Sequence, residues 1–242
     1  MKINLKTYLE ERERMLNSQS VGPVITISRD YGCDEESVVK LLISKLNHLN
    51  GIGLKSHPWR YIDKEILDES ARDLGIKAYD VDHRVIAHHS EVISELLSSF
   101  THHYRLPDKK IIEKVKEIIT TYARKGNVVI VGRGGVGVTK SMENSLHIKL
   151  TAPLEFRAEV VSDFKGVSIA EAKELIHRVD KDRKAWAEHV VDQKITTDIY
   201  DMIFNMESTG VEEITDMIVM LLQKRELVSS QEYSEPRKMM GT

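Results

Sequence analysis

The chain has 242 residues, of which 41% are hydrophobic and 30% charged, and its formal net charge at pH 7 is −3. That length suits one domain with an insertion, and the near-neutral charge argues against a broadly basic nucleic-acid-binding protein. No apolar run approaches the ~20 residues of a membrane-spanning helix, and a single cysteine, Cys33, excludes an internal disulfide. We therefore expect a globular, cytoplasmic protein that binds neither nucleic acid nor membrane.

The N-terminal half alternates apolar runs of strand and helix character. The spacing of apolar residues and the positions of Gly and Pro predict an amphipathic helix within residues 1–20, a strand at Val24–Ser28 and a helix through Val38–Leu46. They then predict a short strand at Trp59–Asp63, a helix at Lys64–Leu74 and mostly helical residues over 76–125.

The C-terminal half continues the alternation. We expect strands at Val128–Val131, Leu146–Leu150 and Met202–Phe204, helices at Pro153–Phe164, from Ser168 to about Val190 and at Val211–Leu227, and a flexible tail over 229–242. Ser168 and Glu171 have the spacing of a capping box, which fixes the start of the long helix.

Strands that are separated by helices favour an α/β fold with a parallel sheet that is covered by helices on both faces. The main domain is expected over residues 21–228. Ligands of such sheets bind at the carboxyl ends of the strands, so the loops that follow the five predicted strands are where a site is expected.

The turn after the first predicted strand, from Ser28 to Ser37, lies where phosphate-binding loops lie in strand–turn–helix proteins. It contains one glycine, Gly32, and no lysine, whereas a P-loop has two glycines, a lysine and a serine or threonine. Three consecutive acids at 34–36 complement the dipole of the next helix and would repel phosphate. On this pattern alone, an ordinary acidic helix start is favoured over a phosphate site.

Two further segments place arginine where an anion would fit. In Gly132–Gly137, glycines would let the backbone approach a ligand while Arg133 binds its charge, or would form only a flexible turn. In His177–Lys184, Asp180 and Arg183 share one helix face. This second segment would either clamp phosphoryl oxygens or form a solvated ladder of ion pairs, and by itself the pattern favours the ladder.

Five of the ten histidines cluster in sequence, at His83, His88, His89, His102 and His103. Their doublets lack the ligand spacing of a zinc site, so we expect structural or surface histidines and no metal site built by the protein alone. Trp59 and Trp186 are expected to be packing residues.

Six segments in a fixed order carry a resemblance to a known family: VITISRDYG, YIDKEIL, VVIVGRGGVGV, LHIKLTAPLEFRAEVV, RVDKDRKAW and DIYDMIFN. Over about residues 22–225 they resemble the cytidylate kinase-like family, which belongs among the P-loop nucleoside monophosphate kinases. The resemblance implies a five-stranded parallel sheet, a helical acceptor-binding insertion at about 64–125 and a lid at about 166–198. It also implies Mg²⁺ with ATP as cofactor and a nucleotide or other small phosphate acceptor as partner, and leaves a homodimer open.

The resemblance also implies roles for the residues that match its motifs. The nucleotide-binding positions are those of Ser28, Arg29, Tyr31, Gly32 and Ser37. The acceptor-binding positions are those of Asp63, Lys64 and Arg133. The catalytic positions, all in the lid, are those of Arg178, Asp180 and Arg183.

The loop departs from the family pattern, because Glu35 stands at the position of the P-loop lysine and Arg29 replaces the first P-loop glycine. A carboxylate ~4 Å from a phosphate costs several kcal/mol at an effective dielectric constant of ~20. Two hypotheses follow. One is a divergent phosphotransferase that moves a phosphoryl group from a nucleoside triphosphate to a small acceptor. The other is a pseudokinase-type binding or regulatory module with a disabled loop. A nicotinamide-dependent dehydrogenase is a distant third, because its glycine fingerprint is absent after the first strand.

Overall fold

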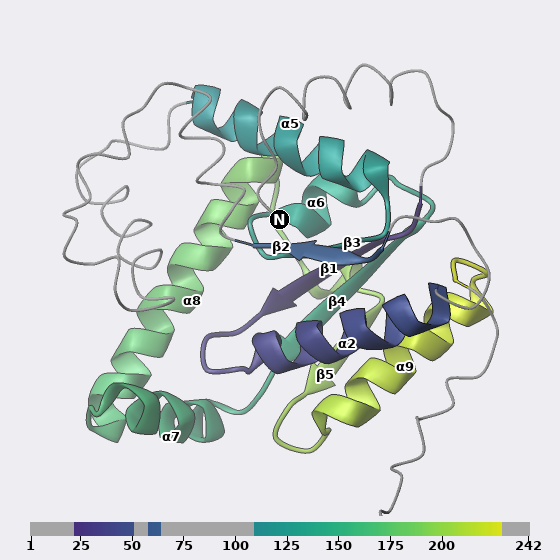
Figure 1. The fold of residues 1–242 in the computed structure, drawn as a ribbon. Helices are drawn as coiled ribbons and strands as arrows, with labels where there is room; N and C mark the ends of the chain where they lie inside the picture. Colours follow the sequence, from purple (N-terminus) through teal and green to yellow (C-terminus); the bar gives the residue numbers. More distant parts are fainter. Residues whose placement is uncertain (1–21, 51–57, 64–108, 229–242) are drawn as a thin grey trace, which may run out of the picture.

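The computed structural model describes residues 22–50, 58–63 and 109–228 (Figure 1). Its strands are β1 Val24–Arg29, β2 Arg60–Ile62, β3 Val128–Val131, β4 Ser145–Thr151 and β5 Met202–Asn205. Its helices are α2 Glu35–Asn50, α5 Lys109–Lys125, α6 Gly135–Thr139, α7 Leu154–Lys165, α8 Ile169–Val191 and α9 Val211–Lys224, with a 3₁₀ turn, η2, at Thr197–Ile199.

Several predictions concern residues outside these ranges. They are the helix within 1–20, the helix at Lys64–Leu74, the acceptor-binding role of Lys64, the five clustered histidines, most of the insertion and the tail at 229–242. Among the residues that the structure does describe, no helix is both long enough and apolar enough to cross a membrane.

The five strands form one parallel sheet in the order β2-β3-β1-β4-β5. This confirms the predicted five-stranded parallel sheet, and each of the five expected strands is present within one or two residues of its predicted ends. Strand β1 lies at the centre, where Ile25 pairs with Val129 of β3 and Leu146 of β4. Because the strands are parallel, the loops that follow β1, β2 and β3 meet at one edge of the sheet.

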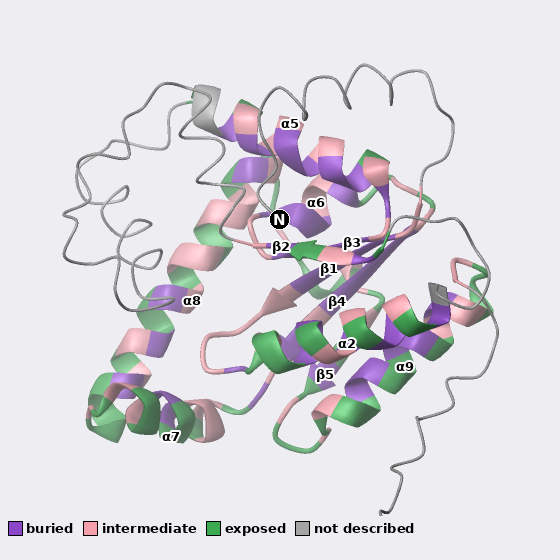
Figure 2. Cartoon of the chain, in the orientation of Figure 1, coloured by how far each residue is buried: buried purple, intermediate pink, exposed green. Residues whose placement is uncertain are grey.

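Helices cover both faces of the sheet, as predicted. Alternate residues of β1 point to opposite faces, so Ile25 and Ile27 pack in one cluster with α2 and α9, whereas Val24 packs in another with α5. These three β1 residues are fully buried, and Figure 2 shows the buried stripe that runs along the central strands and the helix faces above and below them. A sheet that is buried on both faces explains why its strands appear in the sequence as unbroken apolar runs.

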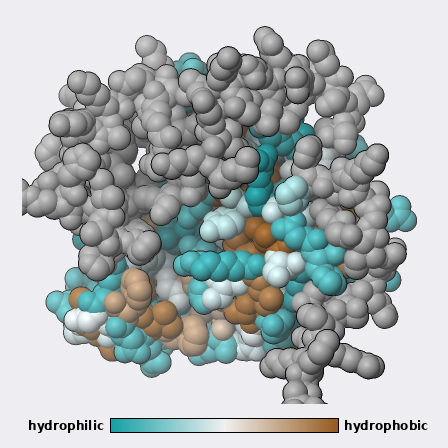
Figure 3. Space-filling model, viewed as in Figure 1, coloured by the Kyte–Doolittle hydropathy of each residue, from teal (hydrophilic) through white to brown (hydrophobic). Residues whose placement is uncertain are grey.

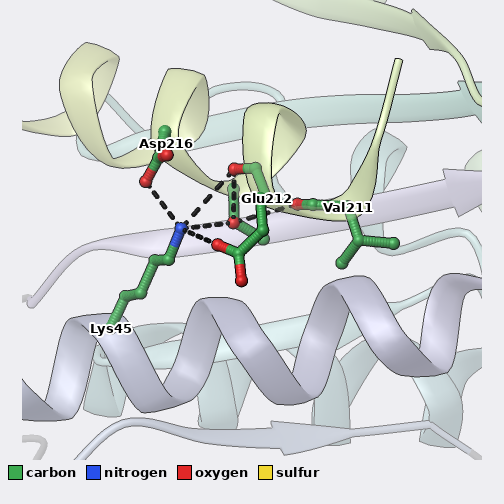
Figure 4. Close-up of polar contacts among 5 residues, drawn as sticks. Lys45, Val211, Glu212 and Asp216 are labelled. Carbon is green, nitrogen blue, oxygen red and sulfur yellow. Dashed lines mark hydrogen bonds and ion pairs between the residues drawn. The ribbon is translucent and has the colours of Figure 1, made fainter. Parts of the chain in front are cut away.

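A buried lysine joins α2 to α9. The Nζ of Lys45 donates to Glu212 Oε2 at 2.8 Å, to Thr215 Oγ1 at 2.9 Å and to Asp216 Oδ1 at 2.6 Å (Figure 4). The Lys45 side chain is 3% exposed, whereas those of Glu212 and Asp216 are 69% and 65% exposed. The acids therefore stay hydrated while they bind the ammonium. Burial lowers the pKa of Lys45, but the hydrogen bonds and charges of Asp216 and Glu212 together outweigh it, so the pKa is raised. The contact fixes the two helices that cover one face of the sheet.

Helix α8 connects the sheet to α7. Its start has the predicted capping box, in which the Ser168 side chain accepts from the Glu171 N–H and the Glu171 carboxylate accepts from the Ser168 N–H. Its N-terminal half packs along α7, and its C-terminal end reaches α5 and α6 (Figure 1). Helix α9 ends at Lys224 rather than at the predicted Leu227, because the chain turns through a left-handed residue at Glu226.

The glycine-rich segment after β3 forms the short helix α6 where the sequence predicts only a turn. A Cβ atom on Gly137 would lie 2.1 Å from Val191 Cγ1, and one on Gly134 would lie 2.9 Å from Val190 Cβ. Both valines end α8. These two glycines therefore allow the close packing of α6 against α8, and Gly134 also lines the cleft that is described below.

Candidate functional site

A cleft of about 1100 Å³ lies at the carboxyl ends of the strands, between the loops after β1, β2 and β3 and the inner face of the α7–α8 pair. The structure brings most of the predicted site residues together along its walls, namely Ser28, Arg29, Tyr31, Gly32, Asp63, Arg133, Arg178, Asp180 and Arg183. Ser37 does not line the cleft. It lies on the exposed side of α2, where its backbone N–H donates to Asp34 Oδ1 at 3.0 Å.

The backbone of the loop between β1 and α2 binds groups of its own protein. The N–H of Tyr31 donates to Asp180 Oδ1 at 2.7 Å, and the N–H of Cys33 donates to the Asp30 carbonyl at 3.2 Å. At the start of α2 the Asp34 carboxylate caps the helix by accepting from Ser37. A phosphate-binding loop leaves such N–H groups free for the ligand. Here Asp34 and Asp180 already accept from two of them.

The charge of Glu35 is paired within the cleft. Arg29 Nε donates to Glu35 Oε1 at 2.8 Å, and the two side chains are 10% and 25% exposed. Arg29 ends β1 and Glu35 begins α2, so the ion pair spans the mouth of the loop. The acid that replaces the P-loop lysine is therefore partly neutralised by the arginine that replaces the first P-loop glycine.

Arg133 approaches the same centre from β3. Residues 132–134 all have positive φ angles, and Arg133, at φ 57°, adopts a conformation that is costly for any residue except glycine. The turn directs Arg133 Nε to within 3.9 Å of Asp63 Oδ1, and Arg29 Nη2 lies 3.9 Å from the same oxygen. Gly132 leaves the space that this needs, because a Cβ atom there would lie 2.4 Å from Arg29 Nη1.

Arg183 of α8 is a cation of the cleft for which the described residues provide no counter-ion. Its Nη1 is buried without a hydrogen-bond partner, and within the described ranges no carboxylate lies within 4.0 Å of its guanidinium. The guanidinium carbon lies 5.3 Å from the ring centre of Tyr31. Burial, and next the positive charge of Arg29, lower the pKa of Arg183 to about 10, and the charges of Glu35 and Asp180 oppose part of this shift. The group stays charged at neutral pH, in a place that favours an anion.

Asp180 connects α8 to the loop between β1 and α2. Its Oδ1 accepts from the Tyr31 N–H, and its Oδ2 accepts from Arg157 Nη1 at 2.7 Å. Arg157 also donates to the Tyr31 carbonyl at 3.1 Å and to the Ala152 carbonyl at 2.9 Å. Both carboxylate oxygens of Asp180 therefore hold protein groups. Sequence reasoning missed Arg157, because nothing in its local pattern shows that it contacts Asp180, 23 positions away, and Tyr31, 126 positions away.

Two side chains of the loop, Cys33 and Asp30, are held in place, Cys33 by burial and Asp30 by hydrogen bonds to β4. Burial, and next the charge of Asp30, raise the pKa of the Cys33 thiol to about 12, so the buried thiol stays protonated at neutral pH and is not an activated nucleophile. Asp30 itself accepts from Lys149 Nζ at 2.7 Å and from Thr151 Oγ1 at 2.6 Å. The loop is thus tied to β4 as well as to α8.

The outer wall of the cleft is apolar. Val160 and Phe164 of α7, which are 40% and 71% exposed, line it together with Leu175 of α8. Figure 3 shows apolar atoms at the surface at lower left, over the region where Figure 1 places α7. The cleft therefore combines a charged inner end with an apolar outer end, which is the usual composition of a site for a small organic anion.

The described residues include no group of three or more His, Cys, Asp or Glu side chains that is arranged to hold a metal ion. Mg²⁺ does not require such a group, because it is commonly bound by one or two carboxylates, by substrate phosphates and by water. Glu35 and Asp63 are the carboxylates next to the arginines of the cleft. This donor set fits a magnesium ion that arrives with its nucleotide.

Comparison with known proteins decides the family. A model of the cytidylate kinase-like family matches residues 24–208, which contain all five strands and the cleft. The chain belongs to the cytidylate kinase-like family. This confirms the resemblance that the six ordered segments carry.

A cytidylate kinase from Ignicoccus hospitalis is 30% identical over 122 residues, which are 48% of this chain and 68% of that protein. The crystal structure of an uncharacterised protein from Eubacterium ventriosum is 21% identical, with a TM-score of 0.56, and the match covers 84% of this chain and 98% of that one. A shikimate kinase from Bacteroides thetaiotaomicron matches 83% of this chain and 98% of its own, at 13% identity and a TM-score of 0.46. As a member of the cytidylate kinase-like family, the chain has the P-loop kinase fold and a kinase-like function.

Proposed function

We propose that this protein is a divergent nucleotide-kinase-like phosphotransferase, which moves a phosphoryl group from ATP to a nucleotide or other small acceptor. The observation that carries the proposal is Arg183, a buried cation that lacks a counter-ion and faces a cleft at the carboxyl ends of the strands. A buried charge without a partner is costly in the unliganded protein. A phosphoryl group supplies the missing negative charge.

The chemistry that this arrangement can perform is positioning and charge stabilisation, with no covalent intermediate on the protein. Arg183 and Arg178, both on α8, would bind the oxygens of the transferred group, on which negative charge increases in the transition state. Arg133 and Asp63 would hold the acceptor beside them. Mg²⁺, when it is bound with ATP, would neutralise part of the phosphate charge.

In this proposal Asp180 is a positioning residue. It holds the Tyr31 peptide and Arg157 with its two oxygens, so it fixes the loop against the lid without touching the substrate. The apolar wall that includes Phe164 suits an aromatic base. The relative from Ignicoccus hospitalis is described as a cytidylate kinase, so CMP is the first acceptor to test.

The experiment is a transfer assay on the full chain, with Mg–ATP as donor and a panel of nucleoside monophosphates as acceptors. Replacing Arg183 by Ala is expected to lower turnover by about 10²-fold or more, as loss of one transition-state donor does in other enzymes. Replacing Lys181 by Ala, at an exposed position of the same helix that does not line the cleft, is the matched control. Equal turnover in the Arg183 variant and the wild type would refute the role of Arg183.

A second candidate function is a binding or regulatory module with a disabled phosphate loop. It is favoured by the loop itself, because the Asp34 carboxylate caps α2 and Glu35 is paired with Arg29 where a phosphate would lie. This candidate predicts no transfer to any acceptor. It also predicts that the double substitution Asp34→Gly and Glu35→Lys creates nucleotide binding that the natural chain lacks. Transfer by the unmodified chain would exclude it.

A further inference from the structure

The α8 wall of the cleft contains a second buried donor beside Arg183. The indole Nε1 of Trp186 is buried, no described residue accepts a hydrogen bond from it, and Trp186 lines the cleft. Residues three apart on a helix are surface neighbours, so Trp186 and Arg183 present their donors on the same stretch of α8. Buried side-chain donors in folded proteins nearly always have an acceptor. Two adjacent exceptions that face one cleft suggest a missing ligand.

The chemistry of the two groups limits what that ligand is. An indole N–H and a guanidinium donate hydrogen bonds and accept none, so the ligand group must be an acceptor. Burial, more than any neighbouring charge, lowers the pKa of Arg183, and the two acids whose charges act on it form ion pairs with other arginines, Glu35 with Arg29 and Asp180 with Arg157. Because Glu35 and Asp180 are engaged with other arginines, an acceptor that carries its own negative charge suits Arg183 best.

We infer that Trp186 Nε1 and Arg183 Nη1 together bind the oxygens of one phosphate group of the ligand, against the α8 wall of the cleft. This inference rests on the proposed function and extends it, because it makes Trp186 a binding residue and not only a packing residue. The indole ring packs against the cluster formed by β3 and α5, which holds its N–H in a fixed direction. A fixed donor loses little side-chain entropy when it binds.

The chain contains two tryptophans, which gives the test a matched control. Trp59 is also buried with an unpartnered Nε1, but it is not among the residues that line the cleft. A Trp59→Phe variant therefore keeps the site and leaves Trp186 as the single fluorescent reporter. Inorganic pyrophosphate is the probe, because it has phosphate oxygens and no base.

Two measurements test the inference. In the Trp59→Phe protein, pyrophosphate is expected to change the emission of Trp186 in a saturable way, at the same concentration at which calorimetry reports binding. In calorimetry, Trp186→Phe is expected to weaken pyrophosphate binding about tenfold, since a hydrogen bond to a charged acceptor is lost. Trp59→Phe is expected to bind like the wild type.

The failures are distinguishable. If the wild type and Trp59→Phe bind pyrophosphate, but Trp186→Phe binds equally well and Trp186 emission does not respond, this assignment is wrong while the proposed function stands. If the wild type binds neither pyrophosphate nor Mg–ATP, the proposed function is wrong, and this inference is refuted with it. The emission measurement uses native Trp186, so it decides the question even if the Trp186→Phe variant does not fold.

Discussion

Replacing Glu35 by Gln should strengthen the binding of phosphate compounds. In the unliganded protein Glu35 Oε1 forms an ion pair with Arg29 Nε at 2.8 Å, and both side chains are largely shielded from water. A phosphate that approaches Arg29 must displace this carboxylate or lie beside it. Gln has nearly the same shape and carries no charge, so the substitution removes the repulsion and releases the arginine.

The magnitude follows from Coulomb's law. Two like unit charges 4 Å apart repel by about 4 kcal/mol at an effective dielectric constant of ~20. Side-chain movement and water relieve part of this, so we expect an affinity gain of roughly 1.5–3 kcal/mol, which is about 10- to 100-fold. The substitution also lowers the stability of the unliganded protein, because Arg29, Arg133 and Arg183 then have one negative charge fewer beside them. Without ligand, the variant should lose about 1–2 kcal/mol in free energy of unfolding.

Calorimetric titration with pyrophosphate measures the affinity, and urea denaturation measures the stability. Glu36→Gln is the control for the loss of one neighbouring charge, because Glu36 is 71% exposed at the rim of the cleft and is already paired with Lys40. That variant should leave the affinity unchanged within twofold. If Glu35→Gln folds and binds pyrophosphate no better than the wild type, the ion pair does not compete with the ligand and the reasoning fails.

Three further predictions concern the fold. Lys45→Met should change the free energy of unfolding by less than about 1 kcal/mol, because Met refills the buried volume and the acids stay hydrated, whereas Lys45→Ala should lower it by about 2–3 kcal/mol. Chemical denaturation compares the two variants, and an equal loss of stability in both would contradict this. Gly137→Ala should lower the free energy of unfolding by about 1–3 kcal/mol, because the added methyl group overlaps with Val191. The double variant Gly137→Ala, Val191→Ala should recover part of this stability in thermal unfolding, and no recovery would rule out the overlap. Burial lowers the pKa of His147, so the folded protein resists protonation of this ring. The free energy of unfolding should therefore fall as the pH drops below the unfolded-state pKa of about 6.5. The fall should be smaller in His147→Gln, and parallel profiles of stability against pH for the two proteins would disprove the role of His147.

The prediction for His147 rests on its hydrogen bonds. Its Nδ1 lies 2.8 Å from Thr26 Oγ1, and its Nε2 lies 3.1 Å from Ser145 Oγ. The Ser145 hydroxyl donates to the Met142 carbonyl at 2.6 Å, so it accepts from Nε2–H, and Nδ1 accepts from the Thr26 hydroxyl. Both nitrogens are satisfied in the neutral ring. A second proton on Nδ1 would take away the acceptor of the Thr26 hydroxyl.

Much of the fold could be predicted from local pattern. The run Val128–Val131 matches β3, and Ser168 with Glu171 marked the start of α8. These signals are local, because strand burial and helix capping depend on residues within a few positions. The short helix α6 could not be predicted, since Gly134 and Gly137 are explained only by the close approach of α8, far along the chain.

The candidate site was predictable only in part for the same reason. The order of the loops indicated that Arg29, Asp63 and Arg133 would lie at one edge of the sheet, because the carboxyl ends of parallel strands share one edge, whereas only the family resemblance assigned Arg183 to the site. Which charges pair there depends on tertiary geometry. The isolated helix pattern favoured a solvated ladder around Asp180, whereas its carboxylate binds Arg157 and the Tyr31 peptide. Glu35, which the sequence marks as a repulsive charge, has Arg29 as its counter-ion.

The central claim is that the arginines of the cleft bind the phosphates of a nucleotide. The most direct measurement is calorimetric titration of the full chain with ATP, with and without Mg²⁺, repeated on Arg183→Ala. We predict saturable binding that Mg²⁺ strengthens and that the substitution weakens by tenfold or more. No heat of binding at millimolar ATP, with or without Mg²⁺, would contradict the claim and leave the cleft without a nucleotide.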